Sequence, residues 1–122
     1  MVRLVILVVD DDDSLRRSLE RLLLAEGYEV QSFKTAEDFL ASSLPNAACL
    51  VLDVYLPGMD GVELQYQLAR TGPRLPVVAI SAHGEDSTGR RALAAGATAF
   101  LTKPFRPSDL LDAIERATAK AS

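Results

Sequence analysis

Residues 49–58 read CLVLDVYLPG, an apolar run that ends in the acid Asp53 and is soon followed by the breaker pair Pro57-Gly58. Four apolar residues in a row, Cys49 to Leu52, are typical of a strand buried on both faces of a parallel sheet. A carboxylate at the end of such a strand is costly to bury unless a partner compensates its charge. Ligands of open α/β sheets bind at this same end of the strands. The stretch therefore predicts a buried central strand that carries a functional acid at its carboxyl end.

Apolar runs and helical patterns alternate along the rest of the chain. The apolar runs predict strands over residues 4–9, 48–53, 75–80 and 97–101, and a loose alternation predicts a further strand over residues 28–33. Between them, leucines and alanines recur at helical spacing, and the helices begin at capping residues or proline and end at glycine. These boundary residues are Thr35, Asp60, Pro107, Gly27 and Gly96. Strands and helices in alternation imply an α/β fold, a single parallel sheet wrapped by helices with right-handed crossovers.

The composition fits one small domain. A chain of 122 residues can bury a core without disulfides or metals. Its 13 basic and 17 acidic residues give a net charge of −4, which argues against a nucleic-acid-binding surface in this segment. The single cysteine, Cys49, lies in an apolar run and is interpreted as a core residue. Because no signal peptide or membrane-spanning run is present, we expect a cytoplasmic protein. Residues 118–122 are expected to be a fraying end or the start of a linker.

Charged and polar residues follow the predicted strands where each strand ends. They are the pair Asp10-Asp11, then Asp53, Ser81 and Lys103. Since the carboxyl ends of parallel strands share one edge of the sheet, we expect these side chains to meet there. Gathered carboxylates repel each other, and a lysine together with a divalent ion would compensate their charge. Oxygen ligands of this kind suit Mg²⁺, and no cluster of cysteine and histidine competes for a softer metal.

The same groups suit phosphoryl transfer. The carboxylate of Asp53 would attack phosphorus and form an aspartyl-phosphate. Mg²⁺, Lys103 and the Ser81 hydroxyl would take up the charge of the phosphoryl oxygens. Taken singly, Ser81 is an ordinary strand-end hydroxyl and Lys103 an ordinary surface lysine, so the prediction depends on their joint placement.

The sequence resembles the receiver domain of bacterial two-component response regulators over almost its whole length. The matching segments are VVDD at 8–11, LVLDVYLPGMDG at 50–61, ISA at 80–82 and KPF at 103–105. Further segments, GYEV at 27–30, AEDFL at 36–40 and HG at 83–84, are most similar to FixJ-type receivers. The resemblance implies a (βα)5 domain whose five parallel strands lie in the flavodoxin-like order 2-1-3-4-5.

The resemblance also implies the metal site and the chemistry at the phosphoacceptor. Asp53 would receive the phosphoryl group from a phosphohistidine on a sensor histidine kinase. The Mg²⁺ ligands would be Asp10, Asp11, Asp53 and the backbone carbonyl of Tyr55. The domain would be a signalling switch and not an enzyme, apart from its own phosphoryl transfer and dephosphorylation.

Further residues would carry the switch. The hydroxyl of Ser81 would move toward the phosphate, Lys103 would contact it, and Phe100 would be the aromatic that changes rotamer. Phe100 is apolar, so an ordinary core role is an open alternative. The bond between Lys103 and Pro104 is expected to be cis. Tyr55 and His83, each two residues beyond a site residue, are hypothesised to flank the path of water and set the phosphate lifetime.

The output implied by the resemblance lies on the predicted fourth helix, fifth strand and fifth helix, roughly residues 85–95, 97–101 and 107–117. Receivers of this type commonly dimerise through that face when phosphorylated, and the homodimer is therefore a possible partner besides the kinase. DNA would be contacted only through an output domain that this chain does not contain. No membrane partner is expected.

Competing interpretations exist for the acidic run 10–13. Asp10-Asp11-Asp12-Asp13-Ser14 also fits the nucleophile motif of haloacid-dehalogenase-type phosphatases, with Asp10 as the nucleophile. That alternative leaves Asp53 without a role and lacks a late acidic pair for Mg²⁺. Asp12 and Asp13 are better explained as negative charge at the start of the first helix. A receiver that works without phosphorylation usually lacks an acid or the lysine, and both are present here.

Overall fold

The computed structural model describes residues 3–42, 46–71, 74–82 and 87–121. Over these ranges the chain forms one parallel sheet of five strands in the order β2-β1-β3-β4-β5, as the resemblance predicted. The strands are β1 (Val5–Val9), β2 (Glu29–Phe33), β3 (Cys49–Asp53), β4 (Val77–Ser81) and β5 (Ala99–Thr102). The helices are α1 (Asp13–Ala25), α2 (Ala36–Ala41), α3 (Gly61–Thr71), α4 (Thr88–Ala94) and α5 (Pro107–Ala121).

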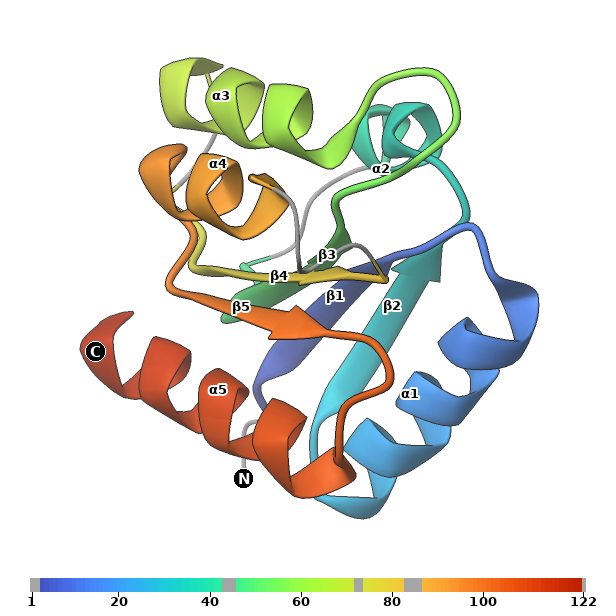
Figure 1. Ribbon diagram of the computed structural model, residues 1–122. Helices are drawn as coiled ribbons and strands as arrows, with labels where there is room; N and C mark the ends of the chain where they lie inside the picture. Colours follow the sequence, from blue (N-terminus) through green and yellow to red (C-terminus); the bar gives the residue numbers. More distant parts are fainter. Residues whose placement is uncertain (1–2, 43–45, 72–73, 83–86, 122) are drawn as a thin grey trace.

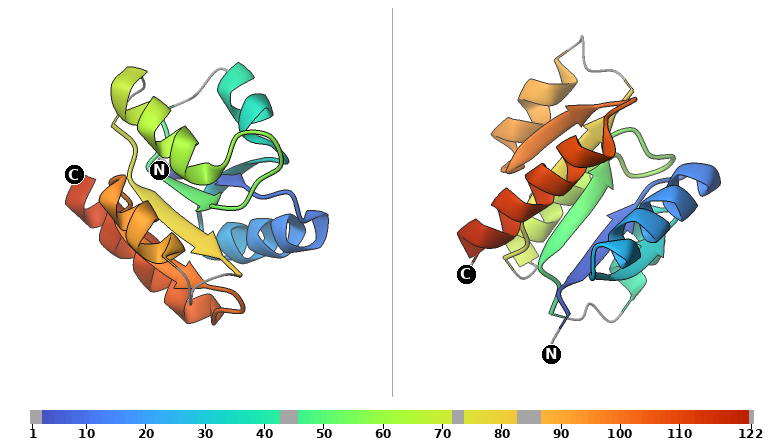
Figure 2. Two further views of the ribbon diagram at one scale, coloured as in Figure 1. Left: turned by 45° about the horizontal axis from the view of Figure 1, so that its top comes forward. Right: turned by 90° about the horizontal axis from the view of Figure 1, so that it is seen from below.

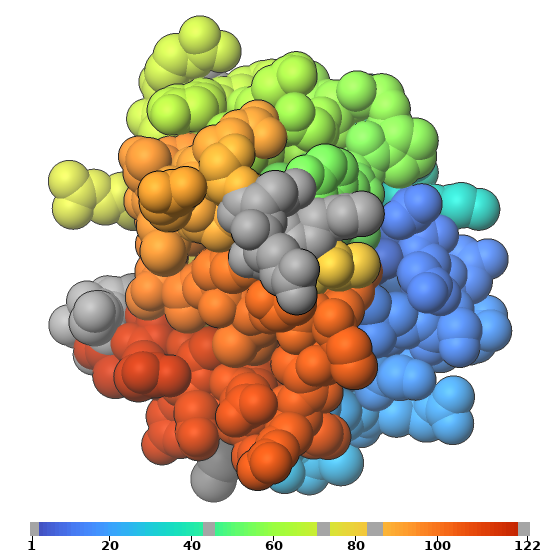
Figure 3. Space-filling model, viewed as in Figure 1, coloured from blue at the N-terminus to red at the C-terminus, as the bar shows by residue number. Residues whose placement is uncertain are grey.

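Helices cover both faces of the sheet. Helices α2, α3 and α4 lie on one face, and α1 and α5 lie on the other (Figures 1 and 2). In the space-filling view, α3 adjoins α4 on one side of the molecule, while α1 and α5 lie toward the opposite side (Figure 3). This arrangement explains why β3 is apolar throughout, because successive residues of the strand point to opposite faces and both faces are covered.

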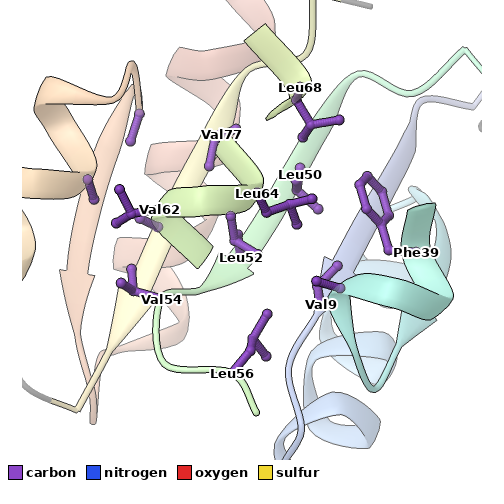
Figure 4. Close-up of a cluster of buried hydrophobic side chains, with 14 of the residues drawn as sticks. Val9, Phe39, Leu50, Leu52, Val54, Leu56, Val62, Leu64, Leu68 and Val77 are labelled. Carbon is purple, nitrogen blue, oxygen red and sulfur yellow. The ribbon is translucent and has the colours of Figure 1, made fainter. Parts of the chain in front are cut away.

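Two apolar clusters, one on each face of the sheet, form the core. Leu50 and Leu52 of β3 pack with helices α2 and α3, where Phe39 and Leu64 are fully buried (Figure 4). The alternate residues of β3 pack on the other face with helices α1 and α5. Cys49 belongs to that second cluster, and burial raises the pKa of its thiol to about 12. The interpretation of Cys49 as a core residue is therefore confirmed.

Helix starts agree with the capping residues that the sequence predicts. The Asp12 side chain accepts a hydrogen bond from the Leu15 N–H at 3.1 Å and so caps α1, at the helix start where its negative charge was expected. Thr35 caps α2 in the same way. The Oδ1 atom of Asp60 accepts from the Glu63 N–H at the start of α3. Each cap satisfies a backbone donor that the helix itself leaves unpaired.

Some predicted boundaries are wrong by a few residues. The strand predicted over 75–80 begins at Val77 and ends at Ser81. Pro76 lacks an N–H and contributes only its carbonyl, which accepts from the Leu50 N–H at 2.9 Å, so the ladder starts after it. The strand predicted over 97–101 is found at Ala99–Thr102.

The last two helices also differ from the prediction. Within the described residues, the helix expected over 85–95 is formed by Thr88–Ala94. The last helix does not stop at residue 117 but continues to Ala121. Whether residues 118–122 begin a linker stays a prediction. Thr118 supports this last turn, because its hydroxyl donates to the Ile114 carbonyl at 3.0 Å. Among the described helices, none is long and apolar enough to cross a membrane.

Candidate functional site

The strand order brings the predicted site residues to one edge of the sheet. Asp10 follows β1, Asp53 ends the central strand β3, and Ser81 ends β4. Lys103 follows β5, and its backbone N–H donates to the Ser81 carbonyl at 2.8 Å. These carboxyl ends point to the same side of the sheet in Figure 1. Residues separated by up to 93 positions in sequence are thereby brought into contact.

Lys103 pairs with two buried carboxylates. Its Nζ atom lies 2.9 Å from Oδ2 of Asp10 and 3.2 Å from Oδ2 of Asp53. Asp10 is fully buried and Asp53 is 5% exposed, so both charges are largely removed from water. A buried charge of this kind is tolerated only when it is paired and hydrogen-bonded. The lysine supplies one positive charge for the two carboxylates.

The second oxygen of each buried acid is held by the backbone of its own loop. Oδ1 of Asp10 accepts from the Asp12 N–H at 2.9 Å, and Oδ1 of Asp53 accepts from the Tyr55 N–H at 3.0 Å. Both side chains are therefore fixed at both oxygens, one by Lys103 and one by a backbone N–H. Such fixed carboxylates are preorganised for binding a cation or a phosphoryl group.

The pKa values of Asp53 and Lys103 are both shifted. Burial and the neighbouring Asp10 charge raise the pKa of Asp53, Lys103 and the Tyr55 N–H lower it in part, and the net result is a pKa raised to about 6. Burial lowers the pKa of Lys103, but the hydrogen bonds and charges of Asp10 and Asp53 outweigh this effect and leave its pKa raised. One lysine thus does not fully compensate the two acids, and a further cation could offset the remaining negative charge.

Three carboxylates form a cluster that could hold a metal ion. Oxygen atoms of Asp10, Asp11 and Asp53 lie within 4.8 Å of one another. Asp11 is exposed, whereas the other two acids are buried, so the cluster opens to solvent on one side. Hard oxygen donors with one open side fit Mg²⁺, which keeps part of its water shell when bound to proteins.

Arg16 supports this acidic cluster and was not predicted from the sequence. Its guanidinium donates to the backbone carbonyl of Asp10 at 2.8 Å and pairs with the carboxylate of Asp13. It thereby fixes the loop between β1 and α1 that carries Asp10 and Asp11. An arginine one turn into a helix, after an acidic run, is also the pattern of an ordinary surface ion pair, and so the sequence alone gave no reason to select it.

The loop after β3 folds back tightly on the end of that strand. The N–H of Gly61 donates to the Val54 carbonyl at 2.8 Å. A Cβ atom at Gly61 would lie only 2.6 Å from the backbone oxygen of Asp53. Only glycine fits this close approach. Gly61 is the last residue of the motif at 50–61, but the sequence did not show that it lies against the backbone of Asp53.

The predicted switch residues occupy different environments. Ser81 is fully buried at the end of β4. Phe100 of β5 is half-buried and packs against the apolar cluster below α4. This position agrees with a core role and leaves the switch role as a prediction. His83 lies outside the described residues. The bond between Lys103 and Pro104 is cis, as predicted.

Tyr55 is placed beside the site and reaches away from it. Its side chain is partly exposed, and its hydroxyl lies 2.7 Å from Oγ1 of Thr88 at the start of α4. Whether its carbonyl is a metal ligand stays a prediction. Thr88 was not predicted as a site residue, because nothing in its sequence context places it next to Tyr55.

Comparisons with known proteins agree on one family. The family model described as "Response regulator receiver domain" matches residues 6–115. Nodulation protein W of Bradyrhizobium diazoefficiens is 44% identical over 117 residues, which are 95% of this chain and 52% of that protein. The transcriptional regulatory protein FixJ of Azorhizobium caulinodans is 34% identical over 116 residues, 94% of this chain and 55% of that protein. The chain therefore spans about half the length of the curated relatives that it matches.

Solved structures show the same similarity in three dimensions. Full-length FixJ from B. japonicum superposes with a TM-score of 0.92 at 35% identity, covering 100% of this chain and 61% of that one. The structure named FIXJ-N superposes with a TM-score of 0.88 at 36% identity and covers 98% of this chain and 96% of that one.

Proposed function

Since this chain belongs to the family of response regulator receiver domains, we propose that Asp53 accepts a phosphoryl group from a phosphohistidine of a sensor histidine kinase. A carboxylate oxygen of Asp53 attacks phosphorus, the bond between phosphorus and the histidine nitrogen breaks, and the imidazole leaves with a proton. The observation that carries this proposal is the position of Asp53. It ends the central strand, contacts Lys103 and shares a cluster with Asp10 and Asp11.

The surrounding residues prepare Asp53 for the transfer. Lys103 supplies positive charge beside the attacking oxygen and then beside the phosphoryl oxygens, and the Ser81 hydroxyl moves toward them. Asp10, Asp11, Asp53 and the Tyr55 carbonyl would hold Mg²⁺. When bound, Mg²⁺ supplies positive charge that lowers the pKa of Asp53 and neutralises phosphoryl oxygens. Charge neutralisation of this kind provides most of the catalysis in phosphoryl transfer.

Phosphorylation then acts as a population shift. The phosphoryl group favours the conformer in which Ser81 and Phe100 have moved, and this conformer presents a different surface on α4, β5 and α5. That face supports a homodimer of the phosphorylated form. Because the relatives are about twice as long, control of transcription would pass through an output domain outside this chain. We also propose that the protein is cytoplasmic and that it catalyses no reaction on other substrates.

Two residues are proposed to set the lifetime of the phosphoryl group. Tyr55 adjoins Asp53 through the hydrogen bond from its N–H, and it is partly exposed. His83 is proposed for the same role only because it lies two residues beyond Ser81 in the sequence. Alanine at either position would change the dephosphorylation rate.

The phosphatase alternative is wrong. The family match extends over residues 6–115 and is to a signalling domain, not to a haloacid-dehalogenase phosphatase.

A transfer assay tests the proposal. The chain is incubated with acetyl phosphate and either Mg²⁺ or EDTA, and the intact mass is followed with time. We expect one phosphoryl group per chain with Mg²⁺, none with EDTA and none in Asp53→Asn. Asp112→Asn, a change on the outer surface of α5, is the matched control and keeps the wild-type result. Steady hydrolysis of the donor by Asp53→Asn would contradict the proposal.

A further inference from the structure

Tyr55 connects the phosphoacceptor to helix α4. Its backbone N–H donates to Oδ1 of Asp53 at 3.0 Å, while its hydroxyl lies 2.7 Å from Oγ1 of Thr88. Thr88 is the first residue of α4 and is 1% exposed. One residue thus contacts the reacting carboxylate through its backbone and the start of a distant helix through its side chain.

The same turn of α4 also contacts Phe100. The residue after Thr88 is Gly89, and a Cβ atom at that position would lie 3.0 Å from Cδ2 of the Phe100 ring. The ring therefore packs directly against the backbone of the first turn of α4. The Thr88-Gly89 pair is thereby contacted from two directions, by the Tyr55 hydroxyl and by the Phe100 ring of β5.

Other contacts between α4 and its surroundings are further from the site. The side chain of Gln65 in α3 donates to the Ala92 carbonyl at 3.1 Å, and Arg91 lies 3.8 Å from the carboxylate of Asp60. The Arg91–Asp60 pair is exposed enough to contribute little. Figure 3 shows α4 against α3, as these contacts require. The contact between Tyr55 and Thr88 joins the start of α4 to the residue whose N–H donates to Asp53.

We propose that Thr88 is a positioning residue for the phosphoacceptor site, and that its hydroxyl holds Tyr55 so that the phosphate lifetime depends on the position of α4. The inference rests on the proposed function of Asp53. While the bond is intact, the Tyr55 ring is fixed beside the loop and restricts the approach of water to the aspartyl-phosphate. When α4 moves, the ring is released and hydrolysis accelerates.

The test compares variants that remove one hydroxyl each. Thr88→Val keeps the shape of the side chain, and Tyr55→Phe keeps the ring. Each chain is phosphorylated with acetyl phosphate and Mg²⁺, freed of donor, and followed by intact mass. We expect the dephosphorylation rate to rise about two- to tenfold in each variant, the range that one hydrogen bond of ordinary net strength allows. The double variant should be no faster than the faster single variant, because both changes break the same bond.

Two controls separate this inference from a general loss of structure. Thr88→Ser keeps the hydroxyl and should restore the wild-type rate. Tyr66→Phe removes the hydroxyl of an exposed tyrosine of α3 and should leave the rate unchanged. If Thr88→Val does not fold, the dephosphorylation rates of Tyr55→Phe and Thr88→Ser are compared with that of the wild type. Tyr55→Phe should then be faster and Thr88→Ser unchanged.

The outcomes distinguish the two proposals. A wild-type chain that takes up no phosphoryl group overturns the proposed function itself. A wild-type chain that is phosphorylated, with Tyr55→Phe and Thr88→Val losing phosphate at the wild-type rate, overturns only the role of Thr88. Independent, multiplicative effects of the two changes would also overturn it, because they would show that the hydroxyls do not act through one bond.

Discussion

At the scale of single residues, the site is defined by incomplete charge compensation. Asp10 and Asp53 are buried beside one lysine, and the pKa of Asp53 stays raised at about 6. The ionised form of Asp53 is therefore costly in the metal-free protein. This cost is useful, because a cation or a phosphoryl group held with a cation relieves it. The fold thus leaves the negative charge of the Asp53 carboxylate only partly compensated.

The raised pKa of Asp53 predicts a pH-dependent stability. An acid whose pKa is raised by folding contributes stability below its unfolded pKa, and that contribution is lost as the pH rises through about 6. Asp53→Asn removes this titration. In EDTA at pH 8, we expect the variant to be more stable than wild type by on the order of 2 kcal/mol, allowing for its lost contact with Lys103. The difference should shrink as the pH falls toward 4.

Denaturant unfolding in EDTA at several pH values measures this difference. Asp112→Asn serves as the control and should show no such trend, since that residue lies on the outer surface of α5. A stability difference that is independent of pH, or one that grows as the pH falls, would show that Asp53 is not held at a raised pKa.

Arg16 gives a second prediction at this scale. Its bond to the Asp10 carbonyl fixes the loop that carries two of the metal-cluster acids. We expect Arg16→Gln to weaken Mg²⁺ binding by about tenfold, the lower end of the effect that is typical of residues that orient metal ligands. Isothermal titration calorimetry measures the affinity. Arg17→Gln removes the same charge from an exposed neighbour, so equal affinities in the two variants would assign the effect to net charge and refute the role of Arg16.

At the scale of helices and strands, the sequence predicts the order of elements better than their ends. Apolar runs identify β1, β3, β4 and β5, and they are longest where a strand is covered on both faces. The edge strand β2, with the sequence EVQSF, shows only a loose alternation. The missed ends have local causes, such as Pro76, which cannot donate to the sheet and shifts the start of β4 to Val77. The extension of α5 to Ala121 was missed because its end, ATAKA at 117–121, carries no large apolar side chain that would mark a buried face.

The tight turn between β3 and α3 makes Gly61 the most restrictive position of these connections. A Cβ atom there would lie 2.6 Å from the Asp53 oxygen and 2.7 Å from the Val54 Cα, both of them backbone atoms. We expect Gly61→Ala to lower the free energy of unfolding by about 2 kcal/mol or more, since backbone must shift to relieve the overlap. Denaturant unfolding measures this loss. Glu63→Ala, an exposed change in the same turn of α3, should cost far less, and equal losses would contradict the contact.

At the scale of the whole molecule, the sheet order turns separate sequence motifs into one site. The sequence could place Asp10, Asp53, Ser81 and Lys103 at strand ends, because parallel strands share that edge. It could not show which side chains from neighbouring elements support them. The contact of Tyr55 with Thr88 spans 33 positions and depends on how α4 packs, which no local pattern encodes. The residues that hold the site from neighbouring helices, such as Thr88, could therefore be identified only from the three-dimensional structure.

The central claim is that the phosphoryl group is carried by the carboxylate of Asp53. The most direct measurement treats the phosphorylated chain with borohydride, which reduces an aspartyl-phosphate to homoserine, and then sequences the peptides by mass spectrometry. The account predicts homoserine at position 53 and unchanged aspartate at positions 10 and 11. Homoserine at position 10, or a phosphoryl group that resists borohydride on another side chain, would contradict it.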